Sequence, residues 1–431
     1  MPKTQAAAAF ARAERAFMAH LPDAGAALAA CLAADPAHAV AHAVQGLGAL
    51  SLGRAALRPV AVAAYGRAIA YAGTDGRATA FAAALGLWLD GNMLAAAARL
   101  EAHLDADPSD ALAFKLAHGI RFMGGDAPGM LRASAQAARR FPAEAPLGSF
   151  VLGCHAFSLE EAGDYSAAEA VGLAAVEADA ADAWGLHAVA HVYEMTGQPL
   201  RGADWLEKTQ PDWQLCNNFG LHVAWHLALF RLELGEGEAA LALYDSAIRR
   251  TPSDEYRDVA NAVSLLVRLE QLGHCVGDRW AALATHAQNF AADDALVFAM
   301  LHRLVAAQQS GADPARTAIA QALDALAQQP HDQGRTAARV GAKFARLIDG
   351  QSVDDADLDA LLAAMPAIGG SHAQRDVFVR LLAERAFLRG DWIQARRILA
   401  FRHRNRAPDR FSRELLQRRR AAARPGTDLR T

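Results

Sequence analysis

The stretch Leu159-Glu-Glu-Ala-Gly163-Asp-Tyr165-Ser-Ala-Ala168-Glu decides the fold class of this chain. One apolar-periodic segment ends before its glycine and another begins near Tyr165, which predicts two helices joined by a tight turn. Similar turns recur along the chain, at Met195-Thr-Gly197-Gln-Pro199, Leu234-Gly-Glu-Gly237 and Leu272-Gly-His-Cys-Val-Gly277. Because each is followed by another apolar-periodic segment, we expect a series of helix-turn-helix units.

Proline and capping residues mark helix boundaries at Asp35-Pro36, Asp107-Pro108-Ser-Asp110 and Thr251-Pro252-Ser-Asp254. Proline follows the end of one helix, and Asp or Ser caps the start of the next. The repeat length of ~34 residues is that of tetratricopeptide helix pairs. We expect about ten pairs, with first helices over residues 37–52, 77–90, 111–123, 146–162, 181–196, 217–234, 257–272, 292–309, 333–349 and 371–389.

A unit of this kind cannot bury its apolar face alone, so neighbouring units stack into one continuous core with a concave side. The sequence therefore predicts an all-α, tetratricopeptide-like α-solenoid, a right-handed superhelix of helix-turn-helix repeats, over residues 1–405. The first helix of each pair is expected to line the concave side. Residues at equivalent places on successive first helices then become neighbours, and the candidate site region is 150–380.

The bulk composition argues against several classes of protein. A chain of 431 residues exceeds the size at which one compact core keeps growing, and its abundant alanine favours helices. A net charge of -4 and a pI near 6.5 give no overall attraction to nucleic acid or to an anionic membrane. A disulfide framework or a thiolate zinc site is not expected, because no Cys-x-x-Cys pair occurs among Cys31, Cys154, Cys216 and Cys275.

Neither a secretory signal nor a membrane span is expected. The N-terminal segment carries Arg12, Glu14 and Arg15 and lacks an uninterrupted apolar stretch. No later run of ~18 apolar residues could cross a bilayer. We therefore expect a cytoplasmic protein.

The C-terminal end is rich in arginine, and we assign residues 406–431 to a basic, partly flexible tail. Such a cluster could contact phosphates. No aromatic stacking platform is interleaved, however, and cations are favoured near a helix C-terminus. We favour a solvated capping helix over a nucleic-acid interface for Arg396, Arg397, Arg402, Arg404, Arg406, Arg410, Arg413 and Arg418-Arg419-Arg420.

The strongest chemical signal is His187-Ala-Val-Ala-His191-Val-Tyr-Glu194. Positions i, i+4 and i+7 share one face of a helix, so two imidazoles and a carboxylate point the same way. Neutral imidazole nitrogen and carboxylate oxygen suit Zn, Fe or Mn. A carboxylate that orients an imidazole also suits proton transfer.

The next first helix repeats this spacing in His222-Val-Ala-Trp225-His226, 35 positions later, which matches the repeat period. One repeat further on stand Arg257 and Asn261. The interval predicts two rows on the concave face, one of His187, His222 and Arg257 and the other of His191, His226 and Asn261. Because packed helices lie ~8–10 Å apart, ligands from adjacent helices reach one ion only if their side chains converge.

We therefore name as candidate catalytic residues His187, His191, Glu194, His222 and His226, and as a candidate set of divalent-metal ligands His187, His191, Glu194 and His226. The alternative is a group of buried, hydrogen-bonded structural histidines. His38 and His42 have the same spacing without a supporting acid, and we interpret them as ordinary helix residues. Lesser candidates, late on predicted first helices, are Glu160, Glu161 and His302.

A second motif is Gly369-Gly370-Ser371-His372-Ala-Gln374-Arg375-Asp376. A serine N-cap after two glycines can present free backbone N–H groups at a helix start, which suits a carboxylate, phosphate or oxyanion. The alternative is a capped helix with solvated charges. We assign substrate binding to Ser371, His372, Gln374, Arg375 and Asp376, together with Asn261, Glu160, Glu161, His302 and Trp225.

Tryptophans crowd the histidine region, and they pack between repeats or line a pocket. We expect packing for Trp184 and Trp213. The sequence contains no Gly-x-Gly-x-x-Gly, Walker loop, Gly-x-Ser-x-Gly or His-Glu-x-x-His. No nucleotide cofactor is therefore expected, and a serine hydrolase is disfavoured.

Five segments together resemble the tetratricopeptide repeat protein 38 family, whose bacterial members are also called StaR-like. They are Ala156-Phe-Ser-Leu-Glu160-Glu161-Ala-Gly-Asp164-Tyr165, His187-Ala-Val-Ala-His191-Val-Tyr-Glu-Met195-Thr-Gly197, His222-Val-Ala-Trp225-His226-Leu-Ala-Leu-Phe230, Val276-Gly277-Asp-Arg279-Trp280 and Gly369-Gly-Ser-His-Ala-Gln-Arg-Asp376. The resemblance is anchored over residues 150–380 and implies a tetratricopeptide-like fold; members are associated with antibiotic gene clusters. The sequence departs from the family pattern at Cys154-His155 and Ala224.

Two functions follow as hypotheses. The first is a small-molecule or metal site on the concave face, in an enzyme that uses metal-assisted or His/Glu acid-base chemistry of hydrolase or oxygenase type. The second is a non-catalytic scaffold that binds a peptide or protein in the groove. Such grooves usually hold carboxylates with Lys and Arg, whereas these rows offer mainly His and Asn, which favours the first hypothesis.

Overall fold

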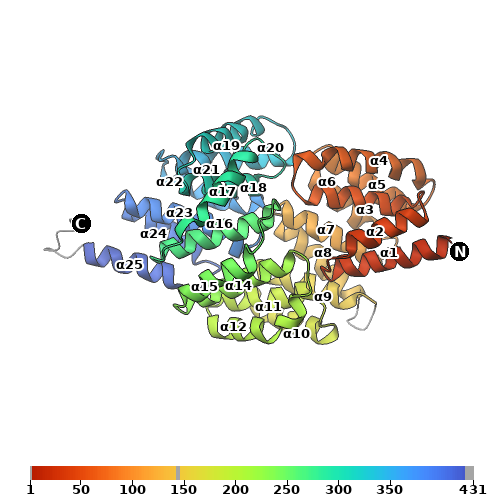
Figure 1. The fold of residues 1–431 in the computed structure, drawn as a ribbon, viewed down its shortest axis with the longest axis horizontal. Helices are drawn as coiled ribbons and strands as arrows, with labels where there is room; N and C mark the ends of the chain where they lie inside the picture. Colours follow the sequence, from red (N-terminus) through yellow and green to blue (C-terminus); the bar gives the residue numbers. More distant parts are fainter. Residues whose placement is uncertain (1, 142–145, 423–431) are drawn as a thin grey trace.

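The structure is a computed structural model that describes residues 2–141 and 146–422, and every regular element in these ranges is a helix (Figure 1). The helices form antiparallel pairs. The first helices of the pairs are α1 (Pro2–Met18), α3 (Ala39–Ser51), α5 (Gly76–Leu89), α7 (Ala111–Met123), α9 (Gly148–Glu161), α11 (Ala183–Met195), α14 (Phe219–Glu233), α16 (Tyr256–Gln271), α18 (Val297–Gln309), α20 (Asp332–Thr336) continued by η4 (Ala337–Gly341) and α21 (Ala342–Ile348), and α23 (His372–Leu388).

The second helices complete the pairs, and one further helix follows the last pair. They are α2 (Ala24–Ala34), α4 (Arg58–Ala72), α6 (Met93–His103), α8 (Ala127–Arg140), α10 (Tyr165–Ala178), α12 (Pro199–Lys208) with α13 (Gln210–Trp213), α15 (Gly237–Leu243) with η2 (Tyr244–Ile248), α17 (Trp280–Asn289), α19 (Asp313–Leu326), α22 (Asp355–Ala364), α24 (Trp392–Arg402) and the terminal α25 (Arg410–Ala422). Short 3-10 turns occupy η1 (Ala55–Leu57), η3 (Gly277–Arg279) and η5 (Met365–Ile368).

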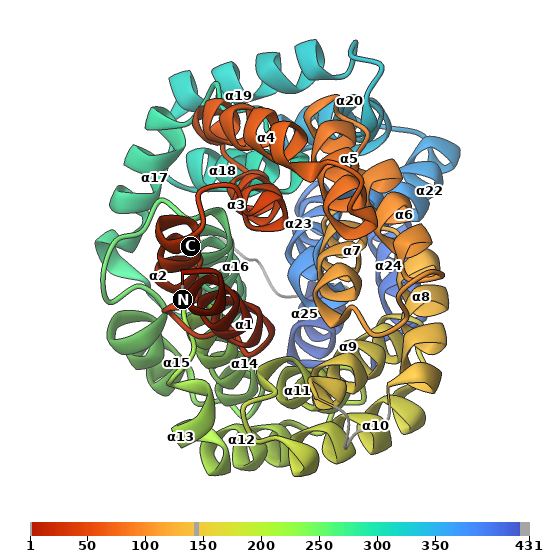
Figure 2. The same cartoon turned by 90° about the vertical axis from the view of Figure 1, so that its right-hand side faces the viewer.

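The predicted all-α, tetratricopeptide-like solenoid is confirmed. Viewed along the superhelix, most second helices, such as α8, α10, α12, α17 and α19, form an outer ring, and first helices such as α9, α11, α14, α16 and α18 lie inside it (Figure 2). The first helices begin close to the predicted positions, except that α18 starts at Val297 rather than at residue 292. In the segment before Val297, the Asp293 side chain instead accepts hydrogen bonds from the backbone N–H groups of Ala55 and Ala295.

Aspartate caps set the start of many helices, as the sequence suggested. The side chains of Asp110, Asp164 and Asp182 each accept a hydrogen bond from the backbone N–H three residues later. Such a bond satisfies one of the free donors of the first turn. The Asp182 cap begins α11, the helix that carries His187 and His191, and so determines where that pair lies along the helix.

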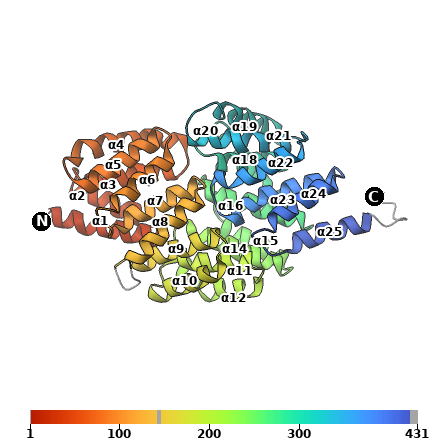
Figure 3. The same cartoon turned by 180° about the vertical axis from the view of Figure 1, so that it is seen from behind.

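After one superhelical turn, the chain contacts the turn that precedes it. The backbone N–H of Ala55 donates to Asp293 over 3.2 Å, and that of Leu94 donates to Asp332 over 3.0 Å; both pairs lie 238 positions apart in sequence. The Tyr165 hydroxyl donates to the Asn405 carbonyl, 240 positions away. One turn therefore takes about seven repeats of ~34 residues, and the N- and C-terminal turns lie side by side (Figure 3).

Two glycines allow these turns to touch. A Cβ at Gly125 would lie 2.0 Å from the Pro366 carbonyl oxygen, and one at Gly369 would lie 2.3 Å from the Met123 carbonyl oxygen. Both residues also have positive φ, +68° and +82°, which glycine adopts without strain. The start of the Gly369-Gly370 motif is thus packed against the end of α7.

Two apolar cores meet at α11. One core runs from α1 to the Trp184 and Ala188 side of α11, and the other runs from Leu186 and Val189 onward to Leu415 near the C-terminus. All residues of α11 are buried. The polar side chains of this helix are therefore enclosed by packing on both sides.

The first part of the expected basic tail is packed into the solenoid. Arg402 donates to Asp376 over 2.9 Å and to Ser412 over 2.9 Å, and Arg413 donates to Glu233 over 2.6 Å. The backbone N–H of Ala407 donates to the Met195 carbonyl over 2.8 Å. Arg413 thus pairs with Glu233 of the preceding superhelical turn, and Arg402 pairs with Asp376 of its own helix pair. Residues 423–431 of the tail lie outside the described residues.

Within residues 2–141 and 146–422, none of the helices combines the length and the apolar character that a bilayer crossing requires.

Candidate metal centre

Four histidines from two adjacent inner helices converge on one point. Their positions follow from the repeat period: α11 supplies His187 and His191, and α14 supplies His222 and His226. The Nε2 atom of His187 lies 2.9 Å from that of His191, 3.0 Å from that of His222 and 3.2 Å from that of His226. All four side chains are buried. We refer to this group as the four-histidine centre.

In three of the four rings, the Nδ1 atom faces an oxygen of a neighbouring side chain. The Nδ1 atom of His226 lies 2.9 Å from a Glu194 oxygen, that of His222 lies 2.9 Å from the Asn261 Oδ1, and that of His191 lies 3.4 Å from a Glu160 oxygen. An Nδ1–H facing an acceptor leaves the Nε2 lone pair free. These three lone pairs point toward the Nε2 of His187.

If the His187 Nε2 carries a hydrogen, it can donate to only one of those three lone pairs. The other short nitrogen–nitrogen contacts therefore need a positively charged ion between the nitrogens. A tetrahedral ion with metal–nitrogen bonds of ~2.0–2.1 Å keeps its ligand atoms about 3.4 Å apart. The observed separations of 2.9, 3.0 and 3.2 Å are close to that value. The donor set therefore fits a metal that prefers imidazole, and it contains no hard oxygen ligand of the kind that Mg²⁺ or Ca²⁺ needs.

Burial keeps most of the centre uncharged. It lowers the pKa of His187 and His222 well below the usual value and that of His226 to about 4, and the neighbouring imidazoles add to the effect. Burial also acts on His191, but the Glu160 carboxylate outweighs it and raises the pKa. Neutral imidazole is the form that binds metals.

Aromatic rings enclose the centre. Trp225 stacks on His222 with ring centroids 5.2 Å apart. Around His187 lie the rings of Phe157, Trp184 and Phe219, at 5.6, 5.3 and 5.1 Å. We call these three rings the aromatic wall. Trp184, which we expected only to pack between repeats, thus contacts a centre residue.

Glu194 lies beside the centre and does not take the ligand position that we predicted. One oxygen accepts from His226 and the other accepts from Arg406 Nη2 over 2.6 Å. The Arg406 guanidinium and His226 outweigh burial and hold the pKa of Glu194 well below its usual range. His222 takes the fourth converging position instead. Both Glu194 oxygens are thus occupied on the side remote from the Nε2 atoms. The role of Glu194 is to orient the His226 ring through its Nδ1 atom.

The second motif lies next to the centre, and its groups are paired with Glu161. Ser371 caps α23 in a reciprocal capping box with Gln374. The His372 backbone N–H donates to Glu161 over 2.6 Å, and Arg375 donates to the other oxygen over 2.9 Å. The anion held at this helix start is thus the carboxylate beside Glu160. Consecutive glutamates at the end of α9 connect the motif to His191.

Asp376 belongs to a separate buried ionic network. It accepts from Arg402 over 2.5 and 2.9 Å, and Arg268 lies 3.4 Å away. These arginines outweigh burial and lower the pKa of Asp376. Arg402 also donates to Asp409, which joins α24 to the start of α25. Asp376 therefore holds the C-terminal segment in place.

Two further predicted residues are not brought to the centre. His302 lies between Phe298 and Phe378, with its Nδ1 2.8 Å from the Phe298 carbonyl oxygen. Arg257 extends the predicted row but pairs with Glu255 over 2.8 Å, and 47% of its side chain is exposed. Of the third members of the two rows, only Asn261 contacts a histidine.

The pairing of Arg406 with Glu194 could not be predicted from the sequence, because these residues lie 212 positions apart, in different superhelical turns. Lys115 and His20 were not predicted either. Lys115 lies with its Nζ 4.5 Å from the centre of the Trp184 ring, and His20 stacks on Trp184 at 5.4 Å. The signal for Lys115 is a lysine in the otherwise apolar first half of α7, which carries His118 and Arg121 further on.

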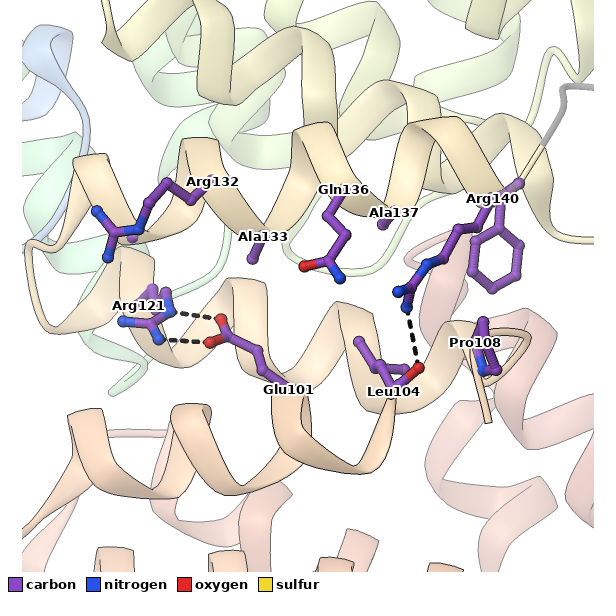
Figure 4. Close-up of a pocket in the computed structure, with 11 residues that line it drawn as sticks. Glu101, Leu104, Pro108, Arg121, Arg132, Ala133, Gln136, Ala137 and Arg140 are labelled. Atoms are coloured by element: carbon purple, nitrogen blue, oxygen red, sulfur yellow. Dashed lines mark hydrogen bonds and ion pairs between the residues drawn. The ribbon is translucent and has the colours of Figure 1, made fainter. Parts of the chain in front are cut away.

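A cavity of about 250 Å³ lies elsewhere, on the outer side between α6, α7 and α8. Arg132, Gln136 and Arg140 extend into it from α8, opposite the ion pair of Arg121 with Glu101 (Figure 4). None of the predicted site residues lines this cavity. Its size alone does not connect it with the chemistry of the four-histidine centre, where the titratable groups converge.

No family model matches this chain. Among solved structures, a monomeric mutant of IFIT1 with Gppp-AAAA is similar to it, at 12% identity and a TM-score of 0.39, over 85% of this chain and 95% of the other. So distant a likeness carries no argument about function. The fold class rests on the stacked helix pairs themselves.

Proposed function

We propose that the four-histidine centre binds one divalent first-row transition metal ion and that His187, His191, His222 and His226 are its ligands. The observation that carries the proposal is the convergence of four Nε2 atoms while the opposite Nδ1 atoms of three rings face Glu160, Glu194 and Asn261. Outer partners of this kind fix the ring orientation of metal-binding histidines. Imidazole nitrogen suits Zn, Fe, Ni and Cu.

We further propose that the metal serves chemistry on a small molecule, which would bind to the four-histidine centre as a fifth ligand. Structural zinc sites stabilise small domains that lack a sufficient core. This solenoid has two extended apolar cores, and α11 and α14 already pack through them. A metal is therefore not needed to join the two helices. The metal-assisted enzyme that the sequence suggested is the function we favour, and membership of the tetratricopeptide repeat protein 38 family remains part of this proposal.

The alternative is a scaffold that binds a peptide on the inner surface. A peptide groove needs an open row of donors for backbone and carboxylate groups. The side chains at the level of the centre are instead buried imidazoles, and those of His222 and His226 already face Asn261 and Glu194. This arrangement gives a peptide few free groups to bind.

Metal analysis of the purified chain tests the proposal. The protein is stripped with a chelator, incubated with Zn²⁺, Fe²⁺, Ni²⁺ or Cu²⁺, desalted and assayed for bound metal. We expect about one equivalent in the wild type and none in His191→Ala/His226→Ala, since neutral imidazole is the ligand form. Wild-type protein that retains no metal would rule the proposal out.

His302→Ala is the matched control. His302 is buried on an inner helix like the centre residues, but it belongs to none of the groups of converging ligand atoms. Its substitution should leave the bound metal unchanged, and circular dichroism should show equal helicity in all variants. Loss of metal in His302→Ala would mean that the effect reports unfolding rather than ligand removal.

A further inference from the structure

Beside the four-histidine centre, several buried nitrogen atoms have no hydrogen-bond partner among the described residues. They include the Trp184 Nε1, the His20 Nε2, the His187 Nδ1 and the Asn261 Nδ2. The Trp184 and Asn261 nitrogens can only donate. Buried donors without acceptors are uncommon in folded proteins. Their grouping around His187 and His222 indicates a place for an acceptor-rich ligand.

A buried cation lies at the same place. Lys115 on α7 is 6% exposed, and its Nζ lies 4.5 Å from the centre of the Trp184 ring and 3.4 Å from the Cys154 Sγ. Among the described residues it forms no direct ion pair, although its charge acts on the buried Asp182 carboxylate and lowers the pKa of that group against the effect of burial. A buried ammonium usually has an anionic partner, because its desolvation is costly. An anion beside Trp184 would supply that partner.

The aromatic wall already holds one flat ring. The His20 imidazole stacks on Phe219 at 4.4 Å and on Trp184 at 5.4 Å, with interplanar angles of 23° and 12°. His20 lies in the turn after α1 and has a φ of 56°, which a residue with a side chain seldom adopts. Its carbonyl accepts from the Asn217 N–H over 2.7 Å. Strained residues of this kind gather at functional sites.

The neighbouring void is too small for another ring. A cavity of about 30 Å³ is lined by Phe122, Arg257 and Gln374, among others, and Phe122 meets the edge of Trp184 at 6.0 Å. This volume accommodates about one or two waters. A flat ligand would therefore have to take the place of the His20 ring.

We infer that the aromatic wall is a subsite for a small carboxylate with a flat apolar body, which displaces the His20 ring and is neutralised by Lys115. The body packs on Trp184 and Phe219, and the carboxylate accepts from Lys115 and the Trp184 Nε1. The subsite borders His187, so it rests on the proposed function in that it names the substrate class of the same centre. Binding itself does not require the metal.

Benzoate is the probe, and the neutral benzamide is its isostere. Titration calorimetry on the metal-free full chain, and on the zinc-loaded chain, measures both. We expect benzoate to bind at least ~10-fold more tightly than benzamide, because only benzoate neutralises the buried ammonium. Equal affinities, or no benzoate binding, would overturn the inference without any variant being needed.

Two variants should shift the affinity in opposite directions. Lys115→Met removes the cation and should weaken benzoate binding by ~10-fold or more. His20→Asn removes the competing ring, and asparagine tolerates positive φ, so this variant should bind benzoate several-fold more tightly. If Lys115→Met leaves benzoate affinity unchanged, Lys115 is not the cation that binds the carboxylate. If His20→Asn leaves it unchanged, the ligand does not displace the His20 ring.

Controls address other carboxylate sites. Lys343→Met removes an exposed lysine, and Arg132→Met removes a cation of the outer cavity; neither should alter benzoate affinity. A loss in Arg132→Met would move the site to that cavity and refute the subsite. Metal without benzoate binding would contradict only this inference, whereas benzoate binding without metal would contradict only the metal proposal.

Discussion

The pair His38 and His42 at the start of α3 and the pair His187 and His191 in α11 have the same spacing but different surroundings. His38 is the N-cap of α3, where its Nδ1 accepts from the Ala41 N–H over 3.1 Å, and the His42 Nε2 lies 2.8 Å from the Pro36 carbonyl oxygen. Both of these nitrogens serve the local helix start. The interpretation of these two as ordinary helix residues agrees with this geometry.

The α11 pair lies mid-helix, beyond the cap, so its nitrogens are free for other helices. The next inner helix carries a second pair in register, and all four rings then share one point. In α5, the equivalent next helix after α3, no histidine occurs. An i, i+4 histidine pair thus indicates a site when it lies inside the helix and recurs one repeat later.

Removing the central ring should give the largest effect. His187→Ala takes away the nitrogen that lies within 3.2 Å of the other three Nε2 atoms. Zinc affinity should fall by more than ~100-fold, which exceeds the usual effect of an outer partner. Competition with a chromogenic chelator measures this, and His42→Ala should match the wild type. If His187→Ala and His42→Ala lose zinc equally, the two histidine pairs do not differ in metal binding as proposed.

His302 is buried without a neighbouring histidine among the described residues, so it shows how burial alone affects the pKa of an imidazole and the stability of the fold. Burial lowers the pKa of His302 to about 4. Since the folded pKa lies below the unfolded one, the stabilisation is complete above about pH 6.5 and is lost as pH falls toward 4. When the pH falls from 7 to 4.5, the free energy of unfolding should decrease in both proteins, and the decrease should be ~2 kcal/mol smaller in His302→Met than in the wild type. Urea unfolding at both pH values measures this; identical pH dependence would contradict it.

The outer partner from the next superhelical turn should have an intermediate effect. Arg406→Met leaves Glu194 without its 2.6 Å guanidinium contact and loosens the orientation of His226. Zinc affinity should fall by ~10-fold, within the range for outer partners, and Arg406→Lys should recover part of it. Cobalt absorption spectra report the altered ligand geometry directly.

Arg410→Met is the matched control for that experiment, because its side chain pairs with Glu414 over 2.7 Å and not with the centre. It should change neither zinc affinity nor the cobalt spectrum. A cobalt spectrum that is the same in Arg406→Met as in the wild type would show that Glu194 orients His226 without help from Arg406.

The smallest effect is expected in α3. His38→Ala removes an N-cap acceptor and should cost ~1 kcal/mol of unfolding free energy with no change in bound metal. His38→Asn should restore most of that stability because asparagine is a good N-cap. Thermal unfolding and metal analysis on the same samples check both statements. Metal loss in His38→Ala would contradict the contrast between the two histidine pairs.

Much of the arrangement could be predicted because it repeats. Turn glycines and capping aspartates are local signals, and they indicated the inner helices, including the buried α11 and α14. The 35-residue interval between His187 and His222 also predicted their contact, since adjacent repeats are related by one nearly constant step. Asn261 followed from the same interval, although it meets His222 rather than His226.

Other features could not be predicted in this way. Glu194 shares the helical face of His191, yet its two oxygens are taken by His226 and Arg406, so it lies beside the four Nε2 atoms. The Gly369-Gly370 motif looked open to a substrate anion, but Glu161 from an earlier repeat occupies its helix start. Glu194 and Arg406 lie 212 positions apart, and Glu161 and His372 lie 211 positions apart.

The amino-acid sequence by itself determined the helix pairs, their period and the row of imidazoles on neighbouring inner helices, because these depend on local capping and on a step of one repeat. Only the tertiary structure decided which side chains close around that row. The rotation accumulated over 212 and 211 positions, about six repeats of ~34 residues, brings Arg406 to Glu194 and His372 to Glu161. Small changes in each step sum along the superhelix, so contacts between its turns leave no local pattern in the sequence.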